Sequence, residues 1–277
     1  MSLAIPSLLM WGLAASAQTV TFEKGPLKKK QRVEYSSVMQ MTVALSVDLG
    51  EQSMDVNMTV EEVERSTYRV LAADSDGPLK IEVVFHEAVS RESGLGEPKV
   101  VESPIVGRTL VIEHTDHRLV VYEGKRETLE PLAITSGAEA WSTFEDLGSF
   151  VGELDSESID VGHRIDMTAA GNLMRVSGSE DFEVTEGSIT LTGLRQHKKR
   201  EWGTFVLQMA GKSTQDADID MTLDVNGTAL VDTRIGLMTQ MMLAGPVTLH
   251  STMEENGVAI ELDGRGQVTY EQTAELR

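Results

Sequence analysis

The chain has 277 residues, of which 40% are hydrophobic and 25% are charged, a balance that allows a large buried core and argues against global disorder. Its formal net charge of −20 argues against nucleic acid and anionic membrane surfaces as partners, because binding either one requires clustered Lys and Arg. The absence of cysteine excludes disulfides, thiol nucleophiles, zinc–thiolate sites and a lipid-modified cysteine.

Residues 1–17 have the pattern of a secretory signal peptide. An apolar run from Leu3 leads into Ala15-Ser16-Ala17, which is an A-x-A cleavage pattern. The run is shorter than the roughly 20 residues that a membrane-spanning helix needs. No Lys or Arg precedes it, which departs from the usual signal and leaves a buried N-terminal helix as the alternative. We expect an exported protein, periplasmic or secreted, with no transmembrane segment.

Residues 18–32 form a basic leader, the one dense basic patch of an acidic chain, with Lys24, Lys28, Lys29, Lys30 and Arg32. We expect it to be a solvated approach to the first strand, and the alternative is contact with an anionic headgroup or an acidic partner. Residues 33–273 contain no long Pro- or Ser-rich linker. They are expected to form a single β-rich domain, in which 33–130 and 155–273 are candidate related halves.

The stretch from Val33 to Gly50, VEYSSVMQMTVALSVDLG, carries apolar residues at most odd positions and polar residues at most even ones. This alternation predicts a long amphipathic strand with one wet face. Similar patterns predict strands at 54–61, 67–73 and 79–89. We further expect a loop at 91–98 and a short hairpin, 109–113 with 118–123, around His114-Thr115-Asp116-His117.

In the middle of the chain, the spacing of apolar residues changes from every second residue to that of a helix. From Ser136 to Leu154, four apolar side chains recur at helical spacing: Trp141, Phe144, Leu147 and Val151. Ser136 is the expected N-cap of this helix, with Glu139 completing a capping box. Gly148 and Gly152 are expected to weaken the helix near its end.

The second half returns to strand patterns. A loop with a short strand is expected at 159–167, followed by strands at 188–197, 203–211, 217–225, 228–233, 237–244, 247–253, 258–262 and 268–272. Asn226-Gly227 and Asn256-Gly257 stand between alternating runs and predict two-residue hairpin turns. About a dozen strands with hairpin connections predict a mainly β (α+β) fold built on an antiparallel sheet.

No motif in the sequence concentrates the groups that catalysis needs. There is no G-x-S-x-G elbow, no H-E-x-x-H and no phosphate-binding loop. His114 and His117 lack an evident third metal ligand, and the aspartates at 216, 218, 220 and 224 alternate with apolar residues, as on a wet strand face. We expect no enzyme, no catalytic residue, no metal site and no cofactor.

Met39-Gln40-Met41 resembles the thioether pairs that bind Cu(I). The two methionines, like most of the 14 in the chain, lie inside an otherwise aliphatic stripe with no histidine nearby. This context favours packing in a core or a pocket over copper binding. Because methionine side chains are unbranched and polarisable, they adapt to apolar surfaces of varied shape.

The segment Asp224–Leu249, DVNGTALVDTRIGLMTQMMLAGPVTL, reads as a strand ending in Gly227, a turn from Asp232 to Gly236, and an apolar strand ending at Gly245, with IDVGH at 159–163 upstream. This order resembles uncharacterised exported bacterial β-rich proteins that are similar in architecture to the LolA/LppX-like lipoprotein-carrier group. The resemblance implies a large curved antiparallel sheet, or half-barrel, with one or two helices on its concave side. It assigns no binding residue, and the missing cysteine departs from lipid-anchored members.

We therefore expect a non-enzymatic exported protein that binds a lipid or another hydrophobic small molecule in a half-barrel cavity. The candidate lining residues are Met39, Met41, Val43, Met54, Met58, Trp141 and Phe144. The alternative is a structural or protein-interaction module of the cell envelope with a solid core and no ligand. Its expected sign is an exposed apolar patch or an unprotected edge strand. The sequence identifies no protein partner.

Overall fold

The computed structural model describes residues 18–22, 27–48, 53–74, 77–94, 96–115, 118–124, 129, 131–149, 158–166, 182–197, 200–213, 219–255 and 258–277. The signal peptide predicted for 1–17 and the turn predicted at Asn256-Gly257 lie outside these ranges. Within them, no helix combines the length and the apolar character that a membrane crossing requires.

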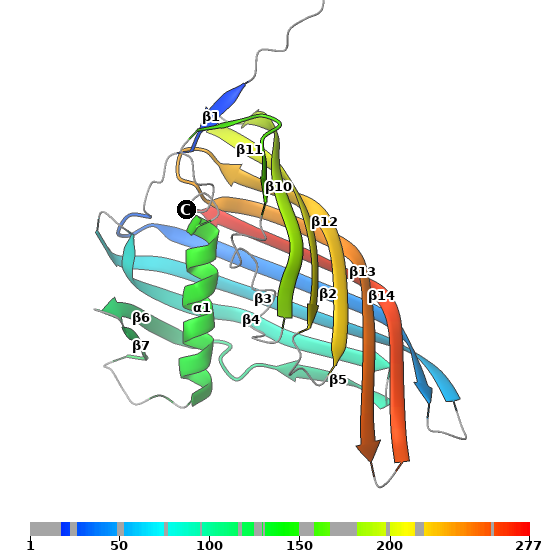
Figure 1. The fold of residues 1–277 in the computed structure, drawn as a ribbon. Helices are drawn as coiled ribbons and strands as arrows, with labels where there is room; N and C mark the ends of the chain where they lie inside the picture. Colours follow the sequence, from blue (N-terminus) through cyan, green and yellow to red (C-terminus); the bar gives the residue numbers. More distant parts are fainter. Residues whose placement is uncertain are drawn as a thin grey trace, which may run out of the picture.

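One antiparallel sheet of twelve strands dominates the structure (Figure 1). Its strand order is β7-β6-β4-β3-β2-β14-β13-β12-β11-β10-β9, and β5 also pairs with β4. The bounds are β2 (Arg32–Asp48), β3 (Ser53–Ala73), β4 (Pro78–Gly94), β5 (Gly96–Glu102), β6 (Thr109–Thr115), β7 (Arg118–Tyr122), β9 (Arg164–Asp166), β10 (Phe182–His197), β11 (Arg200–Ser213), β12 (Asp220–Asp232), β13 (Met238–Glu255) and β14 (Val258–Leu276).

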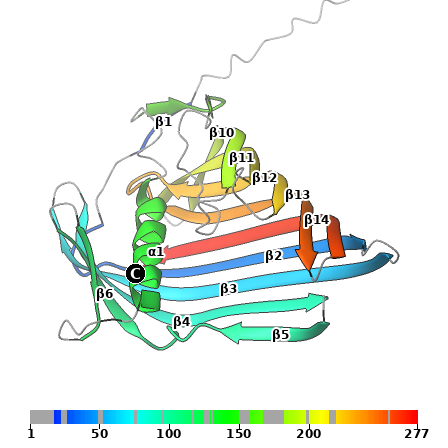
Figure 2. The same cartoon turned by 60° about the horizontal axis from the view of Figure 1, so that its bottom comes forward.

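The sheet curls without closing, and the helix α1 (Pro131–Ser149) stands on its concave side (Figure 2). A separate two-stranded ribbon pairs β1 (Thr19–Thr21) with β8 (Ser158–Asp160). The first long strand, β2, pairs with the last strand, β14, so the two ends of the chain meet in the middle of the sheet. The predicted mainly β half-barrel is confirmed, and one helix is present in the described residues.

Several strands are longer than predicted, because pairing with the neighbouring strands continues through positions that were expected to be turns or loops. Residues 53–73 form one strand, and 91–98 is not a loop, since β4 and β5 continue through it and pair Gly94 with Gly96. Asn226-Gly227 is not a hairpin turn: Gly227 lies inside β12, opposite Leu207 of β11 and Leu243 of β13. Likewise β13 continues through Gly245.

Three glycines in neighbouring strands explain why β12 and β13 continue past Gly227 and Gly245, and they favour curvature of the sheet. A side chain at Gly227, Gly245 or Gly266 would collide with a backbone carbonyl oxygen of the adjacent strand. Glycine inside a strand marks a sharp bend or a close approach of two backbones, and such kinks allow a sheet to coil. These glycines therefore bend β12, β13 and β14 rather than ending them.

The concave face, called the inner face below, carries two hydrophobic clusters. In the helix-side cluster, α1 packs over Val33, Tyr35, Tyr68, Val70, Ile81, Val83, Phe85 and Leu110. In the distal cluster, the curled sheet and the β1–β8 ribbon enclose Val20, Phe22, Val43, Leu45, Ile159, Leu191, Phe205 and Leu207. Both clusters use odd-numbered residues of β2, so one strand face reaches from one cluster to the other.

The helix begins at Pro131, five residues before the predicted N-cap Ser136, which lies inside it. Proline favours the first helical position because its fixed φ suits a helix and its missing N–H is not needed there. Trp141, Phe144 and Leu147 are buried, which confirms the predicted apolar face, whereas Val151 lies outside the described residues.

Candidate ligand-binding face

The inner face is incompletely covered between the two clusters. Along β2, Tyr35 is 6% exposed and Val43 is fully buried, but Ser37, Met39 and Met41 between them are only half-buried. The register places Met41 between Val60 of β3 and Val268 of β14. We call this half-buried apolar surface the inner strip; it comprises Met39, Met41, Met58, Val60 and Val268. Protein side chains fill both ends of the sheet face and leave its middle partly open.

The structure distributes the seven predicted lining residues over several places. Met39, Met41 and Met58 lie in the inner strip, while Val43 is buried in the distal cluster. Trp141 and Phe144 are buried in the helix-side cluster, and Met54 is 47% exposed near the start of β3. Three of the seven thus form one surface, and their role in binding stays a prediction.

The residues weighed as metal ligands from the sequence lie in ordinary surroundings. The His114 ring stacks on Trp141, with ring centroids 5.9 Å apart and planes inclined by 19°, and His117 lies outside the described residues. Asp220 and Asp224 are exposed on the outer face of β12, as expected for a wet strand face, and Asp216 and Asp218 lie outside the described residues.

A set of polar side chains borders the inner strip on the side nearer to α1. We call it the polar end; it comprises Tyr35, Glu64, Ser66, Tyr68, Tyr270 and Gln272. The hydroxyl oxygens of Tyr35 and Tyr270 are 3.4 Å apart, and Tyr270 donates to Gln272 Oε1 at 2.9 Å. Ser66 donates to Glu64 Oε1 at 3.2 Å. The polar end borders the strip directly, because Tyr270 is the register partner of Met39.

The Glu64 carboxyl of the polar end has a raised pKa. Burial raises its pKa above the ordinary value of 4.5; the Ser66 hydrogen bond lowers the pKa by less than burial raises it, and the nearby carboxylate of Glu139 on α1 adds the smallest effect, a further raise. Partial burial also raises the pKa of Glu139, although its side chain reaches solvent. No basic residue is among the groups that act on the Glu64 pKa, so this carboxyl has no compensating charge among the described residues.

Replacing Glu64 with glutamine should make stability less sensitive to pH. A folded-state pKa above the unfolded value means that the folded protein holds the proton more tightly, so Glu64 lowers stability as pH rises from 4.5 toward its folded pKa. Glu64→Gln should therefore be more stable than the wild type at pH 8 and equal to it at pH 4. Urea unfolding at both pH values measures this difference.

The matched control is Glu62→Gln, which removes the same charge from an exposed residue on the same face of β3. It should leave the pH dependence of unfolding unchanged. If Glu64→Gln shows no advantage over the wild type at pH 8, the carboxyl is solvated and the polar end is not a desolvated site.

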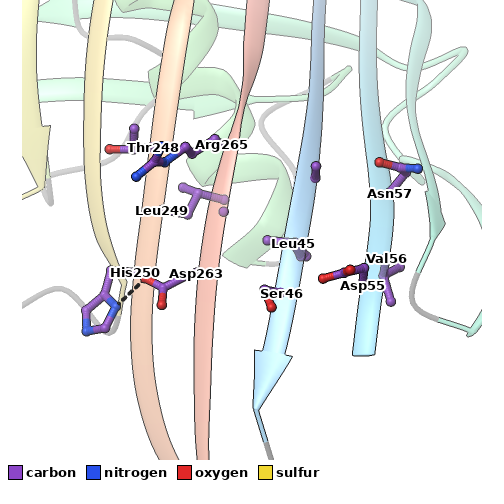
Figure 3. A pocket seen from close by; sticks show the side chains of 12 residues that line it. Leu45, Ser46, Asp55, Val56, Asn57, Thr248, Leu249, His250, Asp263 and Arg265 are labelled. Carbon is purple, nitrogen blue, oxygen red and sulfur yellow. Dashed lines mark hydrogen bonds and ion pairs between the residues drawn. The ribbon is translucent and has the colours of Figure 1, made fainter. Parts of the chain in front are cut away.

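A pocket lies across four neighbouring strands, β2, β3, β13 and β14. The pocket has a volume of about 790 Å³ (Figure 3) and is lined by Ala44, Leu45, Ser46, Asp55, Val56, Asn57, Thr248, Leu249, His250, Asp263, Gly264 and Arg265. By strand alternation, eight of these residues belong to the outer face, and most of the eight are polar. Its polar wall makes it a poorer site for an apolar ligand than the inner strip.

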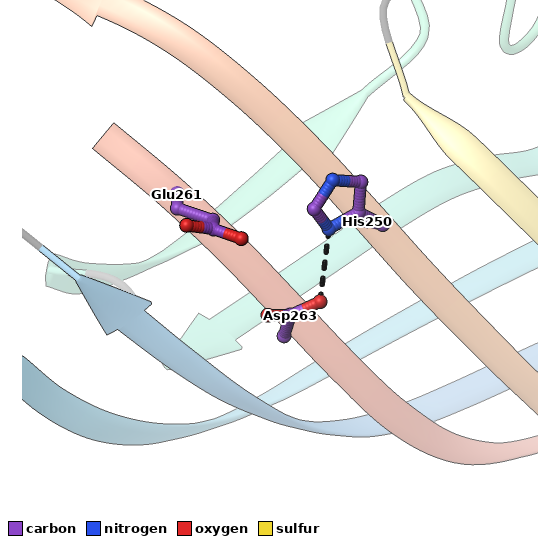
Figure 4. A group of neighbouring side chains, drawn as sticks. All are labelled: His250, Glu261 and Asp263. Atoms are coloured by element: carbon purple, nitrogen blue, oxygen red, sulfur yellow. Dashed lines mark hydrogen bonds and ion pairs between the residues drawn. The ribbon is translucent and has the colours of Figure 1, made fainter. Parts of the chain in front are cut away.

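Beside this pocket, His250, Glu261 and Asp263 bring possible ligand atoms within 4.8 Å of one another (Figure 4). The Nδ1 atom of His250 lies 2.9 Å from Asp263 Oδ1, and this hydrogen bond raises the pKa of the imidazole. All three side chains reach solvent, and the ring nitrogen is already paired, so the group is explained as a surface ion pair. In a hairpin with its turn at Asn256-Gly257, as the sequence predicts, His250 lies opposite Asp263. The sequence therefore contains a signal for this pair, which the register confirms.

No protein-family model and no curated protein sequence matches the chain. Among solved structures, a lipovitellin described for its lipid–protein interactions matches over 92% of this chain and 26% of its own, with 6% identity and a TM-score of 0.42. An outer-membrane channel from Pseudomonas putida matches over 92% of this chain and 98% of its own, with 7% identity and a TM-score of 0.27.

A lipoprotein-sorting protein domain of the outer membrane from Vibrio parahaemolyticus matches over 87% of this chain and 84% of its own, with 9% identity and a TM-score of 0.13. The chain spans about a quarter of the lipovitellin chain. With TM-scores below 0.5, these likenesses carry no argument about a ligand.

Proposed function

We propose that this chain is an exported, non-enzymatic protein that binds a lipid or another hydrophobic molecule on the inner strip. The proposal rests on how burial changes along one face of β2. Tyr35 and Val43 are buried, whereas Met39 and Met41 between them are only half-buried. A bound apolar molecule would remove the remaining exposed surface from water, which is favourable by roughly 25 cal/mol per Å².

The strip has a suitable length and chemistry for this role. The half-buried inner-face positions of β2 run from Ser37 to Met41, which corresponds to about 13 Å at roughly 3.3 Å per residue. A single acyl chain occupies about 15 Å, half of the roughly 30 Å hydrocarbon core of a bilayer. Methionine side chains adjust to guests of different shape, so the strip suits a class of chains better than one rigid ligand.

Placing a charge in the inner strip should weaken the binding of an apolar probe. We expect Met41→Glu to weaken binding of a fluorescent naphthylamine dye at least about tenfold, which is about 1.4 kcal/mol, because the bound dye would bury an unpaired carboxylate. Thr42→Glu is the control, since it adds the same charge at the adjacent exposed position on the outer face. Equal dye affinity in the two variants would place binding elsewhere.

One observation favours the alternative, a protein-interaction module. The edge strand β5 is exposed along its whole length, and Val100 and Val101 are 68% and 61% exposed on its two faces. Pro98 and the charges of Glu97 and Lys99 limit pairing at this edge, since proline and charged side chains are common means of blocking it. In this alternative, the wild-type chain binds no apolar probe.

A further inference from the structure

The polar end contains a hydroxyl group without a partner. Tyr68 is fully buried, and its oxygen makes no hydrogen bond with any residue that the structure describes. The Ser66 hydroxyl faces Tyr68 and affects its pKa, but Ser66 is bonded to Glu64 and does not reach hydrogen-bonding geometry with the phenol. A buried hydroxyl without a hydrogen bond is unfavourable, so a polar group that reached the Tyr68 oxygen would be stabilised there.

The titratable groups around this hydroxyl are acids and phenols. Burial raises the pKa of both Tyr68 and Tyr35, and the nearby charge of Glu64 on the same inner face raises both further. Tyr270 contributes from β14 and Glu139 from α1, so β2, β3, β14 and the helix all present acidic or phenolic groups. Burial disfavours the charged form of a carboxyl, and a cation beside it would stabilise that form.

The polar end and the inner strip are adjacent on the inner face, and within the polar end Glu64 and Tyr270 are half-buried while the other members are buried. Glu64 is the register partner of Ser37 on β2, and the next inner-face position, Met39, begins the strip. Ser37 is also opposite Gln272, whose oxygen accepts from Tyr270. A molecule with its chain on the strip would therefore present its head to Glu64 and Tyr68.

We propose that the polar end binds the primary ammonium head of an amphiphile whose apolar chain lies on the inner strip, an inference that rests on the proposed function. An –NH₃⁺ group has three donors and no acceptor. It would donate to the Glu64 carboxylate and to the orphan Tyr68 oxygen, and its charge would offset Glu64 and Glu139. The tyrosine rings add cation–π attraction. An anionic head is disfavoured by the two carboxylates.

The test compares four twelve-carbon ligands that differ only in the head: dodecylamine, dodecyltrimethylammonium, dodecanol and dodecanoate. Each displaces the naphthylamine dye from the full chain at pH 7.5, below its micelle concentration. We expect dodecylamine to bind at least about tenfold tighter than dodecanol, a difference of about 1.4 kcal/mol. Dodecyltrimethylammonium should fall between them because it has the charge but no N–H donors, and dodecanoate should bind weakest.

Three variants test whether the preference belongs to this site. Glu64→Gln should remove most of the amine preference and keep the affinity for dodecanol, whereas Glu62→Gln, with the same loss of charge, should keep the preference. Tyr68→Phe should weaken dodecylamine selectively over dodecyltrimethylammonium. An equal affinity for all four heads, or a preference that persists in Glu64→Gln, would overturn the ammonium site alone. Failure of every ligand and of the dye to bind would instead overturn the proposed function.

Discussion

Replacing Phe144 with alanine should lower the free energy of unfolding by about 3–5 kcal/mol, the range measured for large buried aromatic residues. Phe144 is 2% exposed, and its ring centroid lies 5.3 Å from that of Tyr68 on the sheet below. Truncation would leave a cavity under α1 that neither the helix nor the sheet can fill without breaking other contacts. Guanidinium unfolding followed by circular dichroism measures the loss.

Ile134→Ala is the matched control on the same helix. Ile134 is 48% exposed, so its truncation should change the free energy of unfolding by no more than about 0.5 kcal/mol. If the two variants lose equal stability, or if Phe144→Ala loses less than about 1 kcal/mol, α1 is not anchored on the sheet, and the helix-side cluster does not bound the inner strip.

Gly245→Ala should cost about 3 kcal/mol, the upper end of the usual range for overpacking. The added Cβ would collide with the backbone oxygen of Asp224 on β12, and a backbone atom cannot move aside without disturbing the ladder between β12 and β13. The thermal midpoint should fall by several degrees, and the loss should appear in calorimetry as a single lowered transition if the sheet unfolds cooperatively.

Gly193→Ala provides the comparison. Gly193 lies in β10, and a Cβ built there meets no atom within 4 Å. This substitution should be neutral or stabilise by about 0.4–1 kcal/mol, because alanine restricts the unfolded chain. If Gly245→Ala is as stable as Gly193→Ala, close approach of the strands is not what requires glycine at the bends.

Local alternation was enough to predict most of the long strands, but not where they end or, throughout β3, which face is buried. It failed at Asn226-Gly227 because a glycine that permits a hairpin turn also permits a bend, and the sequence does not show how closely the next strand approaches. The backbone of Met242, which excludes a side chain at Gly227, belongs to β13, beyond a turn. The helix start was misplaced for a simpler reason: Pro131 is an effective first residue without any capping box.

The inner strip was partly predictable, and the polar end was not. Met39 and Met41 share a face by alternation alone, but Tyr35 and Tyr270 are 235 residues apart and meet only through the pairing of β2 with β14. One local signal was available. In β3 the inner-face residues change from Val60 to Glu62 and Glu64, while Val63 on the outer face is buried, so the pattern inverts in the middle of the strand.

The most direct test of a guest-accessible inner strip is methyl NMR of the protein labelled with [methyl-13C]methionine, in the presence of a spin-labelled acyl chain with an uncharged head. We predict selective broadening of the methyl signals of Met39, Met41 and Met58. The reference is Met242, which is 43% exposed and lies on the outer face, next to Met241 of the distal cluster. Broadening that follows solvent exposure, with Met242 affected as strongly as Met39 and Met41, would contradict binding on the inner strip.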